Sequence, residues 1–289
     1  MADEITLEQL WEMLTLTDEG ADGDGHLWTG PDQSVPEDRV FGGLLLAQSL
    51  VAAAQGLPAG FTPVVLQADF LAGVPTDGRN RWRVTPLGEA PSLVGRRAAL
   101  IDERGVPLFE ATIRFGRERS DLPSYESLQP RDVVGPQDLL DLPDRFAGDE
   151  RIPRWWRIPR PVELRHVEDP NFLVPGAGRQ EEQSLWWRVR GEVVGDALRT
   201  AAVLAYASDM SLVEPVFRAT GTSRHAPGSR ILSLTHSIVF HALPDLTDWV
   251  QMDVAVPRLA HGRGHGLGEL FVGGEHVASL AQVAFVKLA

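Results

Sequence analysis

The chain has 289 residues, of which 43% are hydrophobic and 23% are charged, proportions that are ordinary for a globular protein with a sizeable core. It contains no cysteine, which excludes disulfides, thiolate zinc sites and cysteine nucleophiles. A formal net charge of -13 argues against a nucleic-acid partner, because phosphate binding depends on clustered cations. Lys287 is the single lysine, so arginines would be the ligands for any phosphorylated small molecule.

Two further features bear on location and on metal chemistry. No stretch approaches the roughly 18 consecutive apolar residues that a membrane helix needs, and residues 1–14 are acidic, unlike a basic signal peptide. We therefore expect a cytoplasmic protein without a membrane span. No cluster of histidine and acidic residues has the spacing of a metal site, so the sequence implies neither a metal nor another cofactor.

The first recognisable element is a helix. Residues 41–55 read FGGLLLAQSLVAAAQ, and only Gln48 and Ser49 interrupt the apolar run before its end. Because a helix that is apolar all round must be surrounded by protein, this pattern predicts a central buried helix. Strand-like runs joined by short turns follow it, which indicates antiparallel hairpins. The expected strands cover residues 64–71, 81–85, 94–102 and 108–115.

The middle of the chain differs in character. Residues 117–160 are rich in Pro, Asp and Arg and lack clear periodicity, which is typical of a linker that crosses the surface. The runs VELRHVED and SLWWRVRGE then open a second unit. We therefore expect an N-terminal domain at 1–116, a linker at 117–160, and a C-terminal domain at 161–289 that carries the catalytic residues.

The second unit repeats the plan of the first. An apolar helix is expected over residues 198–217, where Pro215 would disturb its last turn. A shift of about 170 residues places Phe70 on Phe240 and Phe115 on Phe285, as expected for an internal duplication. The second set of strands is expected at residues 231–241, 249–256, 266–272 and 277–287.

One antiparallel sheet wrapped around one buried helix is a hot-dog unit. The duplicated pattern therefore predicts an α+β protein with a double hot-dog fold, in which two antiparallel sheets each wrap around a central buried helix. Because an antiparallel sheet leaves edges that a second copy commonly covers, we also expect a homodimer or a larger homo-oligomer.

Three polar residues of the second unit are candidates for chemistry. Asp209 interrupts the second apolar helix, and a desolvated carboxylate there has a raised pKa and needs either partners or a function. Gln282 lies among apolar neighbours on the last strand and needs partners for both ends of its amide. A structural role, in which each side chain bonds to nearby backbone, is the alternative for both residues.

Ser233 is ambiguous from its pattern alone. Strict alternation along residues 231–241 places Ser233, Thr235 and Ser237 on one face and an apolar row with His236 on the other. That pattern favours a solvated serine face. The internal repeat instead favours a site, because the shift of about 170 residues maps Ser233 onto Pro63 and Gln282 onto Thr112, so the first half lacks these polar residues. A requirement of the fold would appear in both halves, whereas a site need exist only once.

Four short motifs together resemble the acyl-CoA thioesterase II family. They are RVFGG at 39–43, LAYASD at 204–209, HSIVFH at 236–241 and AQVAF at 281–285, and the likeness covers roughly residues 35–115 and 180–287. The family has a double hot-dog fold, and the resemblance implies hydrolysis of a fatty acyl-CoA by direct attack of water. It implies acyl-CoA as the partner molecule and no cofactor.

The resemblance also assigns roles to residues. It implies that Asp209, Ser233 and Gln282 orient the attacking water, and it turns the Ser233 side of its strand toward the site. Gly42, Gly43 and His236 are the candidate substrate-binding residues, the two glycines through their backbone amides. The chain departs from the family pattern at Leu44, Gln67 and Thr235, which we expect to affect substrate choice more than reaction type.

Two other functions stay open on the sequence. The first is an acyl-CoA or lipid binder that kept the fold but lost turnover, which fold similarity alone does not distinguish. The second is a hot-dog hydratase acting on enoyl-CoA, but that chemistry requires an aspartate and a histidine close together before a helix, and no such pair is placed correctly.

Overall fold

The computed structural model describes residues 4–33, 39–76, 78–172, 180–193 and 197–288. Its helices are α1 (Leu7–Leu14), α2 (Gly42–Ala54), α3 (Leu142–Arg145), α4 (Arg154–Arg157), α5 (Ala197–Ser208) and α6 (Pro215–Thr220), with a short 3-10 turn at Pro136–Asp138. Its strands are β1 (Thr17–Asp22), β2 (Gly25–Gly30), β3 (Phe61–Phe70), β4 (Asn80–Ala90), β5 (Leu93–Ile101), β6 (Pro107–Arg117), β7 (Val162–His166), β8 (Glu182–Val189), β9 (Arg230–Phe240), β10 (Val250–Ala260), β11 (Arg263–Val272) and β12 (Glu275–Lys287).

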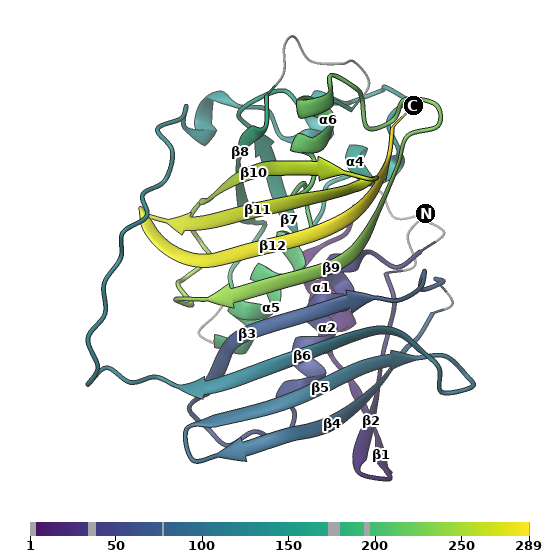
Figure 1. Cartoon of the computed structure of the whole chain (residues 1–289), viewed down its shortest axis with the longest axis vertical. Helices are drawn as coiled ribbons and strands as arrows, with labels where there is room; N and C mark the ends of the chain where they lie inside the picture. The colour runs from purple at the N-terminus through teal and green to yellow at the C-terminus, as the bar shows by residue number, and fades with distance from the viewer. Residues whose placement is uncertain (1–3, 34–38, 77, 173–179, 194–196, 289) are drawn as a thin grey trace.

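All described strands belong to one antiparallel sheet rather than to two. The order is β1-β2-β4-β5-β6-β3-β9-β12-β11-β10-β8-β7, so each half of the chain supplies one half of the sheet. The halves join where β3 pairs with β9, for example Leu66 with Ile238 and Ala68 with His236 (Figure 1). The expectation of two sheets is therefore corrected, because the exposed edges of the two units satisfy each other's backbone groups.

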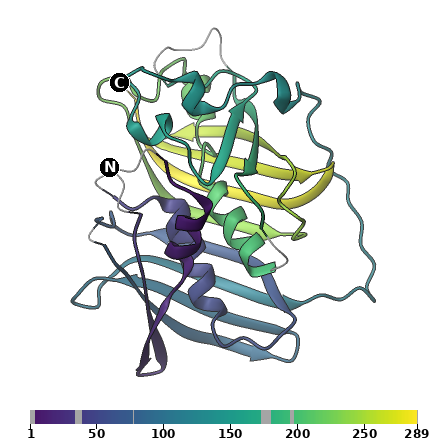
Figure 2. The same ribbon diagram turned by 180° about the vertical axis from the view of Figure 1, so that it is seen from behind.

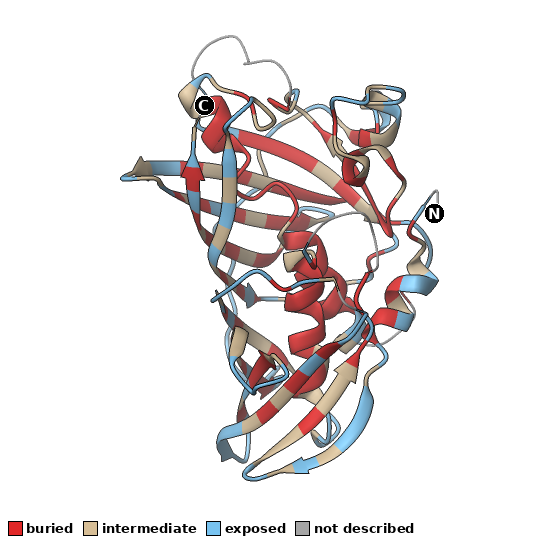
Figure 3. Cartoon of the chain, turned by 90° about the vertical axis from the view of Figure 1, so that its right-hand side faces the viewer, coloured by how far each residue is buried: buried red, intermediate tan, exposed pale blue. Residues whose placement is uncertain are grey.

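Both predicted central helices are present and lie against the same side of this sheet (Figure 2). Helix α2 is buried along nearly its whole length, and α5 packs beside it (Figure 3). The polar Gln48 of α2 is fully satisfied: its amide nitrogen donates to the carbonyls of Met13 and Pro31, and its oxygen accepts from Asn80 and Trp82. Among the described residues, no helix is long and apolar enough to cross a membrane.

The duplication extends to an irregularity in strand pairing. In the first half, Val64 of β3 is skipped between the pairs Pro63 with Phe115 and Val65 with Arg114. In the second half, Leu234 of β9 is skipped in the same way, and Leu234 lies about 170 residues after Val64, the predicted repeat. The same β-bulge thus occurs in both units at equivalent positions.

The second helix ends earlier than expected. Helix α5 stops at Ser208, and Asp209 lies in the turn that follows rather than inside a helix. Pro215 does not end this helix; it occupies the first position of α6, where a proline costs no hydrogen bond. Ser211, with a φ of 67°, lies between the two helices and helps the chain to change direction.

Helix α1 and the hairpin of β1 and β2 near the N-terminus, and the buried part of the linker, were not expected from the sequence pattern. Helix α1 begins with a capping box between Thr6 and Gln9, and the hairpin of β1 and β2 adds an edge to the sheet. The predicted surface linker is exposed over most of 118–135, but its later part is buried at Trp155 and Trp156 of α4. Trp156 contacts Phe172 of the second half, whereas Trp155 contacts Phe41 beside the start of α2. The apolar side chains of residues 152–158 therefore hold this segment against both halves of the chain.

Candidate active site

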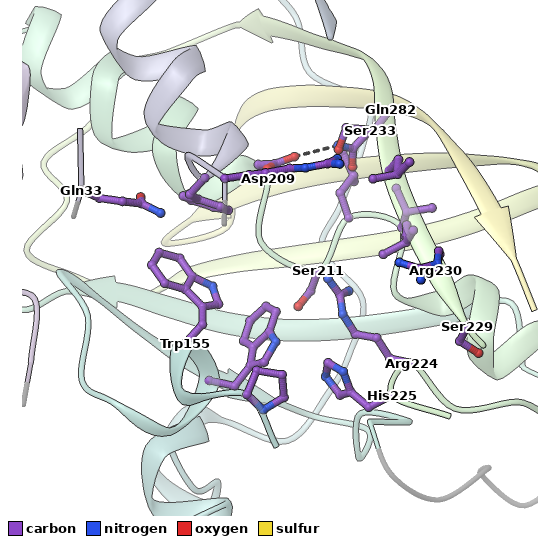
Figure 4. Close-up of a pocket in the computed structure, with 18 residues that line it drawn as sticks. Gln33, Trp155, Asp209, Ser211, Arg224, His225, Ser229, Arg230, Ser233 and Gln282 are labelled. Carbon is purple, nitrogen blue, oxygen red and sulfur yellow. Dashed lines mark hydrogen bonds between the residues drawn. The ribbon is translucent and has the colours of Figure 1, made fainter. Parts of the chain in front are cut away.

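Asp209, Ser233 and Gln282 come from three different elements and meet at one point. Asp209 follows the last turn of α5, Ser233 lies in β9, and Gln282 lies in the neighbouring strand β12. The amide nitrogen of Gln282 donates to Asp209 Oδ1 over 2.7 Å and to Ser233 Oγ over 2.9 Å (Figure 4). Gln282 therefore links a carboxylate to a hydroxyl, and because the hydroxyl accepts this bond, its own hydrogen remains for a ligand.

The bulge in β9 explains why Ser233 faces this site. Thr235 pairs with Val283 and Ser233 pairs with Ala284, so Leu234 is an extra residue that reverses the alternation. Leu232 and Leu234 are accordingly 44% and 36% exposed, whereas His236 is fully buried. The sequence pattern placed these three on one face because strict alternation assumes an unbroken strand.

Burial sets the protonation of Asp209. Its side chain is only 9% exposed, and this desolvation raises its pKa from 3.8 to about 7. The hydrogen bond from Gln282, the charge of Arg224 and the backbone N–H of Gly43 act in the opposite direction and limit the rise. A carboxylate whose pKa lies near neutral pH is suited to take a proton in general-base catalysis.

Two glycines bring the start of α2 against the end of α5. A Cβ added to Gly42 would lie 2.5 Å from Asp209 Oδ2, and one added to Gly43 would lie 2.2 Å from the Tyr206 carbonyl oxygen. A side chain at Gly43 would therefore collide with backbone, whereas one at Gly42 would press on the Asp209 carboxylate. The N-terminus of α2, with its partial positive charge, faces the carboxylate and favours its ionised form.

His236 lies beside Asp209. Its Nε2 shares a 2.9 Å hydrogen bond with Ser208 Oγ, whose direction depends on the tautomer of the ring. Burial lowers the pKa of His236 to about 3, so the ring is neutral. Its Nδ1 is 3.8 Å from Asp209 Oδ1. The structure therefore places His236 behind Asp209, not in the wall of the pocket described next.

A pocket of about 570 Å³ opens in front of the three residues, a volume in the usual range for small-molecule sites. Its walls come from both halves of the chain and from the predicted linker. Figure 4 shows these side chains converging on one space. The lining residues are Gln33, Arg39, Phe41, Pro153, Trp155, Trp156, Asp209, Ser211, Leu212, Val213, Arg224, His225, Ser229, Arg230, Ile231, Leu232, Ser233 and Gln282.

Several of these lining residues were not predicted from the sequence. Trp155 and Trp156 fall within the predicted linker, but they are buried and line the pocket. Arg224 and His225 lie in an irregular segment after α6 and carry no sequence signal of a site. Conversely, the departures at Leu44, Gln67 and Thr235 lie outside the described lining.

The described residues contain no group of three or more histidine, aspartate or glutamate side chains arranged to hold a metal ion. The polar side chains around the pocket are instead a carboxylate, two amides, an imidazole, hydroxyls and guanidinium groups, besides the indoles. This set can orient water and carbonyl oxygens through hydrogen bonds and can take up one proton at Asp209.

Comparison with protein families gives two matches that together span most of the chain. Residues 31–116 match the acyl-CoA thioesterase N-terminal domain, and residues 136–286 match the acyl-CoA thioesterase C-terminal domain. Among curated proteins, human acyl-coenzyme A thioesterase 8 is 25% identical over 263 residues, covering 86% of this chain and 80% of the relative.

Two solved structures share the architecture. An acyl-CoA thioesterase II from Mycobacterium marinum superposes with a TM-score of 0.76 at 22% identity, covering 97% of both chains. A hot-dog protein of unknown function from Alicyclobacillus acidocaldarius also gives 0.76, at 19% identity, covering 96% of this chain and 97% of its own. These likenesses confirm the predicted hot-dog fold.

Proposed function

The chain belongs to the acyl-CoA thioesterase family, and we propose that it hydrolyses a fatty acyl-CoA to a free fatty acid and CoA. The observation that carries this proposal is the meeting of Asp209, Ser233 and Gln282 at the wall of the pocket. Burial gives Asp209 a pKa of about 7, so the carboxylate is partly ionised at neutral pH and is able to accept a proton.

The reaction proposed is direct attack by water. Asp209 removes a proton from a water molecule as the water oxygen bonds to the thioester carbonyl carbon, and the carbonyl oxygen becomes an oxyanion. The C–S bond then breaks, and Asp209 returns its proton to the CoA sulfur. General-base help of this kind contributes roughly 100- to 10,000-fold. No covalent bond to the protein forms.

Donors near Asp209 would stabilise the oxyanion. The Ser233 hydroxyl accepts from Gln282, so its own hydrogen is available to the carbonyl oxygen or to the water. At the start of α2, the N–H of Gly43 already bonds Asp209, which makes Gly42 the better candidate for a substrate contact. Oriented donors of this kind contribute roughly 100- to 1,000-fold each.

The substrate would lie across the boundary between the two halves of the chain. The apolar lining that would contact an acyl chain consists of Phe41, Trp155, Trp156, Leu212, Val213, Ile231 and Leu232. Arg39 and Arg230 also line the pocket and are exposed, so they are the candidate ligands for the CoA phosphates. His236 would act on Asp209 rather than on the substrate.

We propose that the reaction requires no metal or other cofactor, since Asp209 carries out each proton transfer and the amide and hydroxyl groups supply the hydrogen bonds that orient the water and the carbonyl oxygen. Dialysis against EDTA should then leave thioester hydrolysis unchanged. A loss of activity that added Mg²⁺, Mn²⁺ or Zn²⁺ restores would contradict this.

The domain division and the assembly are proposed as well. We propose units at 1–116 and 161–289 joined by residues 117–160, a cytoplasmic location, and a homodimer or a larger homo-oligomer. The outer face of β9, β11 and β12 exposes the apolar side chains of Leu234, Leu267 and Phe285, which would suit contact with a second copy. Light scattering of the wild type and of Leu234→Glu tests the proposed assembly, and a monomeric wild type would contradict it.

The experiment that tests the function follows release of the CoA thiol with a disulfide dye, across acyl-CoAs from acetyl to palmitoyl. Release by the wild type supports hydrolysis and gives the preferred chain length. Binding of acyl-CoA without release would favour the alternative of a non-catalytic binder.

A further inference from the structure

The charge inside the pocket is opposite to that of the chain. The protein has a formal net charge of -13, yet three arginines, Arg39, Arg224 and Arg230, line the pocket, and Asp209 is the one acidic side chain among its described lining residues. Such local complementarity favours an anionic ligand. Arg39 and Arg230 are exposed, whereas Arg224 is half-buried and reaches into the pocket from the wall opposite Asp209 and Gln282 (Figure 4).

Arg224 is held in a fixed orientation. Its Nη1 donates to Glu214 Oε2 over 2.8 Å, and Glu214 is fully buried. The guanidinium carbon lies 5.2 Å from the centre of the Trp156 ring, and the Arg224 backbone N–H donates to the Asn171 carbonyl. Within the described part of the chain, Glu214 engages one guanidinium N–H, so the other donors of this planar group remain for a ligand.

Arg224 faces the same space as the proposed reaction centre. Its side chain lines one pocket together with Asp209, Ser233 and Gln282 (Figure 4). The CoA phosphates are separated from the thioester by the long pantetheine arm, so they would contact the exposed arginines instead. An anionic group on the acyl side of the thioester is the group that would meet Arg224.

We propose that Arg224 is a specificity-determining residue that binds a carboxylate at the far end of the acyl group, so that the pocket prefers dicarboxylic acyl-CoA thioesters. A planar guanidinium binds a carboxylate through two parallel hydrogen bonds. This inference rests on the proposed thioester hydrolysis and names the substrate class of the same site.

The test compares adipyl-CoA with hexanoyl-CoA, whose acyl chains are equally long and differ in the terminal carboxylate. The ratio of their kcat/KM values is measured for the wild type, Arg224→Lys and the double variant Arg224→Gln with Glu214→Gln. The second substitution avoids leaving Glu214 buried without its partner. Arg230→Gln is the matched control, since it removes an exposed arginine from the same pocket.

We expect the wild type to favour adipyl-CoA and the double variant to lower the ratio about 10- to 100-fold, the usual effect of losing hydrogen bonds to a charged group. Arg224→Lys should lower it less, and Arg230→Gln should leave it unchanged. Measurement well above pH 7 keeps Asp209 ionised in every variant.

Three outcomes are distinguishable. Hydrolysis of both substrates with a ratio that Arg224 does not affect would overturn this inference alone. Equal loss with both CoA substrates, without loss on N-acetylcysteamine thioesters that lack phosphates, would also overturn it and assign Arg224 to the CoA phosphates. Absence of hydrolysis of any acyl-CoA by the wild type would instead contradict the proposed function.

Discussion

Gln282 donates a 2.7 Å hydrogen bond to Asp209 Oδ1 although the two residues are 73 positions apart in the chain. The bond favours the ionised carboxylate, whereas burial favours the protonated one, and the balance leaves the pKa of Asp209 at about 7. Gln282 thereby connects the last strand of the sheet to the protonation state of the proposed base.

The first prediction concerns the pH dependence of activity. Because the base must be ionised, kcat/KM should fall as the pH decreases through about 7, the pKa of Asp209. Gln282→Met removes a bond to the ionised form, so the midpoint should move to higher pH and the plateau should decrease. Stopped assays of CoA release between pH 5 and 9 measure both, and a profile that is flat down to pH 5 would exclude Asp209 as the base.

The second prediction concerns stability. The pKa of Asp209 is raised in the folded state, so between pH 4 and pH 7 the folded state holds a proton that the unfolded state has lost. The free energy of unfolding contributed by this group therefore decreases as the pH rises through that window. Asp209→Asn should raise the melting temperature at pH 8 more than at pH 4, as measured by calorimetry. An equal or smaller gain at pH 8 would show that the carboxylate is not desolvated.

The third prediction tests the bulge in β9. Ser233→Ala removes a hydroxyl from the site and should lower kcat roughly 100-fold, the usual effect of losing one oriented donor. Ser237→Ala changes a serine of the same strand that pairs with Ala281 and Gln67, away from the described lining of the pocket, and should have no effect on kcat. Equal losses in the two variants would mean that alternation is unbroken along this strand.

The fourth prediction separates two adjacent glycines. The Cβ of Gly42→Ala would press on the Asp209 carboxylate, and that of Gly43→Ala on the Tyr206 backbone. Alanine is better than glycine in a helix by about 1 kcal/mol, so Gly42→Ala should fold but lose most activity. Gly43→Ala should lose stability, because the backbone cannot move aside as a side chain can. Thermal unfolding and CoA release on the same samples measure these effects, and full activity in Gly42→Ala would contradict the close contact.

The repeat was the part of the fold that could be predicted best from the sequence. A shift of about 170 residues matches β3, β4, β5 and β6 with β9, β10, β11 and β12, since each pair of strands occupies the same environment. The joining of β3 to β9 was not predictable, because an edge strand and an inner strand have similar patterns. Asp209 was misplaced inside a helix for a comparable reason: the residues after it are as apolar as those before it.

The site was likewise predictable only in part. Polar residues such as Asp209 and Gln282 stand out in an apolar sequence, and so they were predicted as site residues. Arg224 was not predicted, because an arginine in an irregular segment is usually solvated, and only its contacts with Glu214 and Trp156 distinguish it. The orientation of Ser233 was not predictable, because it depends on a β-bulge whose residues do not differ in type from those of a regular strand.

The most direct test of the proposed mechanism is CoA release by the wild type and by Asp209→Asn under identical conditions, with acyl-CoA binding measured by calorimetry on both proteins. We predict that Asp209→Asn binds acyl-CoA with unchanged affinity but releases CoA roughly 100- to 10,000-fold more slowly. Release by Asp209→Asn at the wild-type rate would contradict the assignment of Asp209 as the base that activates water.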